Sequence, residues 1–599
     1  MCKGRHTWIR AGLAALGLWT GAASTLWGRA FEGVHRYGKN GEASIHFYTV
    51  FDRLPAHGYA PVVVAVENNF SESITWNLTF RCSSGSGVFR TRATITATGK
   101  GGLSREEILV PVATEYSSHG YNAGELEVTV TASGLEPARF QVYSNSPSGW
   151  PAIGLSSDLA TIHDGTLNQR VESATGQSYG VDFGTAYDPI DLPADWRGYS
   201  GLDVLVLTAA VWSGDLLRSD ARVAILEWVH LGGTLDIYDL EESYDLKVLG
   251  FPGESGGRER SLGAGKVRLF SGAFDPGPAV STYQSMTPLR RNKLLAETYE
   301  RGGWPLQTAL GLRSFNAWII VVVLTFFAIL VGPVNLFVLA RSGKRHRLFL
   351  TTPLISIGTS LLLVLIILAQ DRFGGVGNRM AVVGLDAEGH RAFVTQEQFS
   401  RTGVLFSGDF DAPDPLFISH VMLPRTQWTR VRPGWSGDLA FLFERGQPDR
   451  MRGDWFFSRS EQGHYLQSVR PTRARIERLA TEDAKGDVVL FSNIGFDLDG
   501  LFYISQDGSY WTASGELATG RPLRLRKTEE AEFDAWWRGL QGAGSQGLTR
   551  IMDEVASRPG SFYASAPVGA FAVDTLRGIR WKESQHVLYG PVPLVQQAP

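Results

Sequence analysis

The stretch FAILVGPVNLFVLARSGKRHRLFLTTPLISI, residues 327–357, decides how this chain of 599 residues is organised. It places a short basic segment between two long apolar runs, which cover residues 317–340 and 348–369. Each run exceeds the ~20 residues that a helix needs to cross the hydrocarbon core of a bilayer. Neither run contains a charged residue. We therefore predict a transmembrane hairpin of two helices.

The basic turn between the runs, residues 341–347, predicts the topology. Its sequence RSGKRHR contains no acidic residue, and short loops rich in Lys and Arg stay on the cytoplasmic side. Residues 1–30 have a basic start, an apolar middle and small residues near the end, which is the pattern of a secretory signal peptide. Both features predict a multi-pass protein of the cell (cytoplasmic or inner) membrane, with both large parts extracytoplasmic.

Pro333 and Asn335 are unusual residues for an apolar helix. Proline removes a backbone hydrogen bond and clashes with the preceding turn, so we expect a kink. Asn335 is expected to satisfy the freed backbone group or to bond the second helix through Thr351, Thr352 or Ser356. Neither run contains an ionisable residue, which argues against a transport pathway. The hairpin is therefore an anchor, and Pro333 and Asn335 shape it or form a face that docks to a membrane-protein partner.

Residues 31–148 show a period of two. Apolar and polar residues alternate in ITWNLTFR (74–81) and in ELEVTVT (125–131), and pieces rich in Asn, Ser and Gly separate such segments. Alternation of this kind with frequent turns predicts a β-sandwich.

The pattern changes after residue 148. GLDVLVLTAA (201–210) reads as a buried strand, SDARVAILEWVHLGG (219–233) as a helix with a glycine stop, and TLDIYD (234–239) as a second strand. A strand, a helix and a strand in succession form a βαβ unit. We predict a small parallel α/β domain over residues 149–300.

The run from 199 to 239 resembles the glutamine-amidotransferase-like domains of exported accessory proteins, including gliding-type subunits that accompany ABC transporters. The wider order is similar to that of a family of large uncharacterised bacterial membrane proteins, in which a span ending GPVN (332–335), a basic turn and a second span lead to NRMAVVGLD (378–386). The resemblance implies a flavodoxin-like parallel sheet in the α/β domain and an ABC transporter as a candidate partner.

The residues where this class performs its reaction do not match. Amidotransferases are similar in carrying a cysteine nucleophile on a turn after a central strand, whereas this chain has TAA (208–210) there and no cysteine in the domain. Nucleophilic catalysis of that kind has no agent without a thiolate. The prediction is a retained fold without the reaction.

Ligands of open parallel sheets nevertheless bind at the carboxyl ends of the strands. Thr208, Trp212, Asp239 and Glu241 follow the two predicted strands and are the candidates for a vestigial pocket. The alternative is that they are loop residues at a solvated sheet edge.

Residues 375–599 are predicted to form a second exported, β-rich domain, with one helix at TEEAEFDAWWRGLQ (528–541). Four aromatic residues in this part suggest either a sugar-binding platform, with a glycan as ligand, or ordinary core packing. They are Tyr510, Trp511, Trp536 and Trp537.

Other classes of function find little support. A net charge of -3 argues against nucleic-acid binding. The histidines stand singly and no P-loop is present, so we expect neither a metal nor a cofactor. Two G-x-S-x-G matches, around Ser178 and Ser255, lie in glycine-rich surroundings without the strand and helix that a hydrolase elbow needs.

The leading hypothesis is a non-enzymatic integral membrane protein that acts as an accessory or scaffold subunit. Its partners would be the lipid bilayer and a membrane complex, such as an ABC transporter, or an envelope component. The alternatives are an exported hydrolase with an unrecognised site and a protein that binds cell-envelope glycans.

Overall fold

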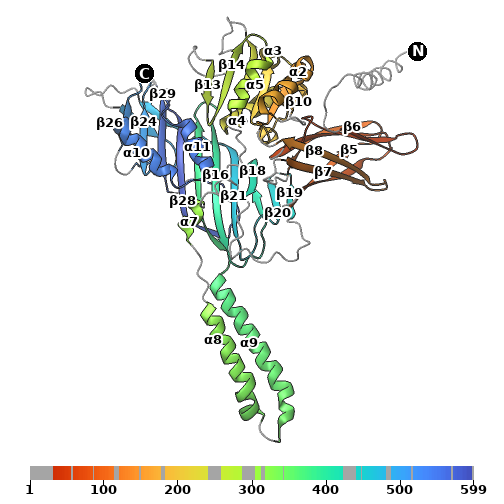
Figure 1. Ribbon diagram of the computed structural model, residues 1–599, viewed down its shortest axis with the longest axis vertical. Helices are drawn as coiled ribbons and strands as arrows, with labels where there is room; N and C mark the ends of the chain where they lie inside the picture. The colour runs from red at the N-terminus through yellow and green to blue at the C-terminus, as the bar shows by residue number, and fades with distance from the viewer. Residues whose placement is uncertain are drawn as a thin grey trace, which may run out of the picture.

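The computed structural model describes most of the chain. The described residues are 32–55, 58–84, 87–112, 121–147, 150–176, 182–240, 258–286, 304–311, 317–340, 343–421, 440–446, 448–479, 488–513, 517–567 and 571–595. The predicted signal peptide, Ser178 and Ser255 lie outside these ranges. The chain forms several sheets and one long helical hairpin, which projects from the sheet-rich body (Figure 1).

Two antiparallel sheets form the N-terminal part. One has the order β1-β2-β3-β6. The other contains β5, β4, β7 and β8 in adjacent places. The alternation in ITWNLTFR places Trp76, Leu78 and Phe80 in the core that the two sheets share, because successive side chains of a strand point to opposite faces. The strands are β1 (Glu32–Tyr37), β2 (Ala43–Thr49), β3 (Tyr59–Asn68), β4 (Ile74–Ser84), β5 (Gly87–Ala97), β6 (Gly102–Pro111), β7 (Tyr121–Ala132) and β8 (Ala138–Pro147).

Strands from far along the chain extend the second of these sheets. β19 (Ala440–Glu444) pairs in parallel with β5, and β20 (Asp449–Gly453) and β17 (Phe410–Ala412) follow. The Phe89 and Phe441 rings stack across this junction at 4.7 Å. The sequence-based division of the chain at residues 148 and 375 does not anticipate this pairing, because it assigns these strands to a separate C-terminal domain.

The α/β part has the strand order β10-β9-β11-β12-β14-β13. The first five pair in parallel, in the order 2-1-3-4-5 that is one of the two common doubly wound arrangements. The predicted parallel βαβ unit is confirmed by β11, α4 and β12. The strands are β9 (Ile153–Ser156), β10 (Thr185–Tyr187), β11 (Val204–Thr208), β12 (Thr234–Leu240), β13 (Glu259–Leu262) and β14 (Gly265–Ser271). The helices are α2 (Ser157–Thr175), η2 (Pro189–Asp191), η3 (Trp196–Tyr199), α3 (Ala209–Ser213), α4 (Ser219–His230) and α5 (Pro276–Ser285).

The hairpin consists of α8 (Ala317–Ile329), a π-helical continuation η4 (Leu330–Leu339), the short η5 (Arg345–Arg347) and α9 (Leu348–Asp371). Within the described residues, its two arms are long and apolar enough to cross a membrane. Almost none of their surface is covered by the rest of the protein, since 11% and 0% of the two apolar segments are buried. Such uncovered apolar helices are unlike the core helices of soluble domains.

The second arm of the structure's β content is a sheet of 12 strands. Its order is β18-β21-β16-β15-β28-β27-β24-β25-β26-β23-β22-β29. The strands are β15 (Gly375–Asp386), β16 (Arg391–Thr402), β18 (Leu416–Val421), β21 (Glu461–Pro471), β22 (Ile476–Leu479), β23 (Val488–Ser492), β24 (Gly500–Ile504), β25 (Tyr510–Ala513), β26 (Pro522–Thr528), β27 (Ser561–Ala566), β28 (Ile579–Pro591) and β29 (Leu594–Val595). The helices α7 (Pro305–Leu310), α10 (Glu530–Gln541) and α11 (Gln546–Val555) accompany it.

The predicted helix at 528–541 corresponds to α10. Trp537 is buried in the core, and Trp511 and Trp536 pack partly against it. Trp536 also contacts the Phe502 ring, at 4.8 Å between ring centroids. These contacts match the core-packing alternative for the tryptophans of this region.

Candidate functional site at the base of the hairpin

Strand β16 carries an unusual sequence for its position. It lies between β21 and β15, inside the large sheet. All residues of TQEQFS (395–400) are nevertheless buried. Buried polar groups are costly unless they are hydrogen-bonded, so the partners of this strand show what the site is built to hold.

The Glu397 carboxylate is fully buried and links three parts of the chain. Its Oε2 accepts a hydrogen bond of 2.9 Å from Trp304 Nε1 and one of 3.3 Å from the backbone N–H of Ser545. Its Oε1 accepts a short hydrogen bond from the Ser545 hydroxyl. Trp304 immediately precedes α7, and Ser545 is the N-cap of α11. A single side chain therefore ties two helices to the middle of β16.

Burial changes the protonation of this carboxyl group. Loss of solvent raises the pKa of Glu397 to about 7, although the hydrogen bonds from Ser545 and Trp304 oppose the shift. Desolvation outweighs the donors because a carboxylate loses most of its hydration inside a protein. Glu397 therefore changes its charge near neutral pH.

Further contacts hold the segment that leads into the hairpin. Asn378 Nδ2 donates to the Leu306 carbonyl at 3.2 Å, and Arg401 Nη2 donates to the Gly311 carbonyl at 2.6 Å. Arg401 is itself paired with Glu461 at 2.6 Å. We call residues 304–311, with the side chains that hold them, the neck.

The neck fixes both ends of the hairpin to one sheet. Residues 304–311 precede α8, and β15 follows α9 almost directly. Figure 1 shows α7 against the end of the large sheet from which the hairpin leaves. The position of the hairpin is therefore coupled to β15 and β16.

The other face of β16 holds a strap, residues 571–575. The Gln396 side chain donates to the Val573 carbonyl at 2.9 Å and accepts from the Val573 N–H at 2.8 Å. Gln398 Nε2 donates to the Thr575 hydroxyl at 3.1 Å. The paired bonds of Gln396 imitate those of a neighbouring strand, so the amide holds an extended backbone in place of one.

Two charged or titratable residues lie near this strap. Arg379 pairs with Asp574 at 2.7 Å and bonds the Ser584 hydroxyl at 2.8 Å. His586 is buried, and neither of its ring nitrogens has a hydrogen-bond partner among the described residues. Burial and the nearby Arg379 lower the pKa of His586 to about 4. The imidazole is therefore neutral at physiological pH.

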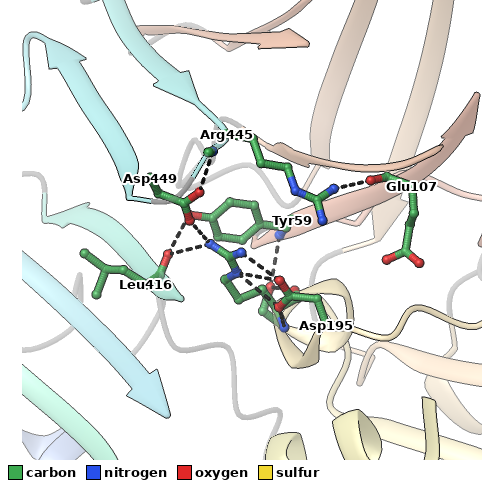
Figure 2. A network of polar contacts seen from close by, with 9 residues as sticks. Tyr59, Glu107, Asp195, Leu416, Arg445 and Asp449 are labelled. Atoms are coloured by element: carbon green, nitrogen blue, oxygen red, sulfur yellow. Dashed lines mark hydrogen bonds and ion pairs between the residues drawn. The ribbon is translucent and has the colours of Figure 1, made fainter. Parts of the chain in front are cut away.

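A second polar network joins the three extramembrane parts around Arg197 of η3. Its guanidinium donates to Asp195 Oδ2 at 2.7 Å and to Asp449 Oδ2 at 2.6 Å. Tyr59 donates its hydroxyl to the Leu416 carbonyl at 3.3 Å. Figure 2 shows these groups converging, with Arg445 reaching the Glu107 backbone beside them. The sandwich, the α/β part and the large sheet thus meet at one buried cation.

The charges of this junction support one another. Burial alone would raise the pKa of the Asp195 carboxyl, but Arg197 outweighs it and holds that pKa below its usual value. Burial likewise opposes the charge of Arg197, whereas Asp195 and Asp449 raise its pKa. The ion pairs stay charged at all ordinary pH values, so the junction is a permanent connection, in contrast to Glu397.

The residues predicted to line a pocket in the α/β part have local structural roles. The Thr208 hydroxyl accepts a hydrogen bond from the Val211 N–H and caps α3. Trp212 is buried in the core, and Asp239 is exposed with a φ of 62°. Glu241 lies outside the described residues. Thr208 and Asp239 follow adjacent strands, as predicted, but the structure does not bring a binding pocket to them within the described residues.

Asn335 faces the second arm of the hairpin. Its Nδ2 donates to the Thr352 hydroxyl at 2.9 Å, and its Oδ1 accepts from the Thr351 hydroxyl at 2.6 Å. The side chain is fully buried, and Pro333 lies one turn earlier in η4. The wider π-helical turn also provides the 3.0 Å bond from the Ala340 N–H to the Asn335 carbonyl. The amide thus joins the two arms, as the interhelical alternative predicts.

A cavity of about 80 Å³ lies between the sandwich and the α/β part, lined by Phe51, Arg53, Trp150 and Phe183 among others. Asp52 is beside it, and burial raises the pKa of its carboxyl to about 6. The cavity is far smaller than the usual volume of a small-molecule site. Within the described ranges, no group of three or more His, Cys, Asp or Glu side chains is placed to hold a metal ion.

Comparisons with known proteins add little to this geometry. No protein-family model matches the chain, and a search of curated proteins also finds no match. Among solved structures it is similar to Bacteroides uniformis beta-glucuronidase 2, at 10% identity over 33% of this chain and 24% of that one, with a TM-score of 0.13. A yeast delta-COP-I mu-homology domain gives 10% identity over 37% and 98%, with a TM-score of 0.16.

A third similarity is to the Amycolatopsis orientalis exo-chitosanase CsxA, at 10% identity over 43% of this chain and 27% of that one, with a TM-score of 0.14. The chain spans about a quarter of the length of the glucuronidase that it matches. Matches of this size carry no argument about activity, so the functional interpretation has to come from the site.

Proposed function

We propose that this protein is a non-enzymatic, membrane-anchored accessory subunit whose extracytoplasmic part is rigidly coupled to its transmembrane hairpin. The neck is the observation that carries this proposal. A hairpin that only tethered a domain would need no buried carboxylate, no paired arginine and no capped helix at its base. Here Glu397, Asn378 and Arg401 hold the segment before the hairpin against the sheet that follows it.

The hairpin arms support insertion into a bilayer. Large side chains on them are exposed, such as Phe337 at 71% and Leu361 at 59%, and a lipid environment removes the cost of that exposure. Two helices cannot enclose a pathway by themselves, and neither contains an ionisable residue. The proposed role is therefore to position a larger membrane partner relative to the exterior domains.

The resemblance seen in the sequence belongs to the same proposal. The α/β part would be a glutamine-amidotransferase-like domain without the nucleophile, and the partner would be an ABC transporter or a related membrane complex. Residues 1–30 would export the first part as a signal peptide, and the basic turn would remain in the cytoplasm. Both large parts would then lie outside the cytoplasm, which is the topology that the charge pattern predicts.

Site-specific photo-crosslinking in intact membranes tests this function. A photoreactive side chain at Phe337, which faces away from the rest of the protein, is expected to capture one membrane protein that also co-purifies in mild detergent. The matched control places the same group at Ile162 of α2, exposed to 71%, in the extracytoplasmic part. Recovery of the chain alone, with lipid as the sole adduct at Phe337, would refute the accessory role.

A further inference from the structure

Two phenylalanines project from the base of the sheet-rich body beside the hairpin. Phe406 is 91% exposed and Phe373 is 60% exposed, and their rings stack at 5.5 Å with 6° between their planes. Large aromatic side chains are usually buried in soluble proteins. An exposed pair held in a fixed stack therefore indicates a contact surface.

The backbone around this pair is firmly held. The Val404 N–H donates to the Arg372 carbonyl at 2.9 Å, and the Gly374 N–H donates to the Val404 carbonyl at 3.1 Å. The Leu405 N–H donates to the Ser458 hydroxyl at 2.9 Å. The loop that carries Phe406 is thus attached to the chain that leaves α9. The stack keeps its place relative to the hairpin.

The position of the pair identifies what it contacts. Phe373 follows the last residue of α9, Asp371, and the hairpin brings the start of α8 to the same end. Trp318, near that start, is 70% exposed. Aromatic residues collect where transmembrane helices leave the hydrocarbon core, because their rings suit the headgroup region. The exposed Arg372 lies between α9 and the pair, where a cation can reach lipid phosphates.

We propose that Phe373 and Phe406 insert into the headgroup and acyl boundary of the extracytoplasmic leaflet and fix the height of the large sheet above the bilayer. This inference rests on the proposed membrane insertion of the hairpin. The occupant of the surface is lipid, since the pair continues the outer face of α9. With the neck below the sheet and the aromatic pair beside it, the exterior part has one orientation to the membrane.

Spin-label accessibility on the full chain in lipid nanodiscs tests this. Single labels go at Phe406→Cys, Leu361→Cys and Leu103→Cys, in a background carrying Cys2→Ser. Cys82 stays, because it is buried in the sandwich core. Leu361 reports the arm α9. Leu103, 76% exposed in the sandwich, reports the aqueous side.

The expected result is an oxygen-to-nickel accessibility ratio at position 406 that lies several-fold above that at position 103 and below that at position 361. An aqueous value at 406, together with a bilayer value at 361, would overturn the proposed contact and leave membrane insertion intact. An aqueous value at 361 would overturn insertion, and the contact with it. Since Phe406 is almost fully exposed, its replacement does not disturb a core.

Discussion

Trp304 Nε1 donates a 2.9 Å hydrogen bond to Glu397 Oε2, and both side chains are almost completely buried. One residue immediately precedes the helix α7 that leads to the hairpin, and the other lies within the large sheet. The bond therefore connects the membrane anchor to the exterior part at a point where water does not compete.

Trp304→Phe is expected to weaken the neck. The replacement keeps an aromatic ring but removes one donor from a buried carboxyl group, which costs about 1–3 kcal/mol. Thermal unfolding of the detergent-solubilised protein should show a lower midpoint. The matched control is Trp318→Phe, since Trp318 is exposed on α8. Equal midpoints for the two variants would contradict the role of the bond.

Glu397 makes stability depend on pH. Its pKa in the folded protein is about 7 and its ordinary value is 4.5, so folding favours the protonated form. This contribution is fully present below about pH 4.5 and is lost as the pH rises through 7. The shift corresponds to roughly 3 kcal/mol.

Unfolding measured between pH 5 and pH 8 should therefore show the wild-type protein losing stability as the pH rises. Glu397→Gln cannot ionise, so its loss over the same interval should be smaller. Parallel curves for the two proteins would show that Glu397 does not titrate in this range.

The Arg197 junction is expected to be permanent. Asp449→Asn leaves the guanidinium with one buried carboxylate fewer, and breaking a buried pair in this way costs about 3–5 kcal/mol. Limited proteolysis should then cut between the extramembrane parts much faster. Asp409→Asn, which affects a solvent-exposed pair with Arg452, is the control and should leave the digestion pattern unchanged. Similar digestion of both variants would contradict the assignment.

Asn335→Leu should loosen the hairpin without preventing its insertion. The variant loses both hydrogen bonds to α9, and interhelical bonds of this kind contribute about 0.6 kcal/mol each. The efficiency of a disulfide cross-link between the two arms measures the effect. Ser356→Ala is the control, because Ser356 is not one of the partners of Asn335. An unchanged cross-link in Asn335→Leu would contradict this role.

Much of the fold is local enough to be predicted. The hairpin follows from two uncharged apolar runs, and the βαβ unit follows from a continuous apolar strand and a periodic helix. The alternating segments 74–81 and 125–131 gave two central strands of the sandwich. Each of these signals lies within one short window of sequence, where side-chain periodicity reports burial directly.

The remainder depends on contacts across long distances in the chain. The pairing of β19 with β5 joins residues 440–444 to 88–92, and nothing in either segment specifies the other. TQEQFS has no apolar pattern, so the sequence gives no sign that it lies inside a sheet. The one available signal for the neck was Trp304, a large aromatic residue just before an anchor. Its partner, Glu397, could be found only from the fold.

Labelling with a thiol reagent that does not cross membranes tests the central claim most directly. Single cysteines replace Leu103 in the sandwich, Lys582 in the large sheet and Lys344 in the basic turn, in the Cys2→Ser background. We predict that positions 103 and 582 react in cells with an intact inner membrane, whereas position 344 reacts only after lysis. Equal labelling of all three positions before lysis would contradict an anchored hairpin with both large parts on the outer side.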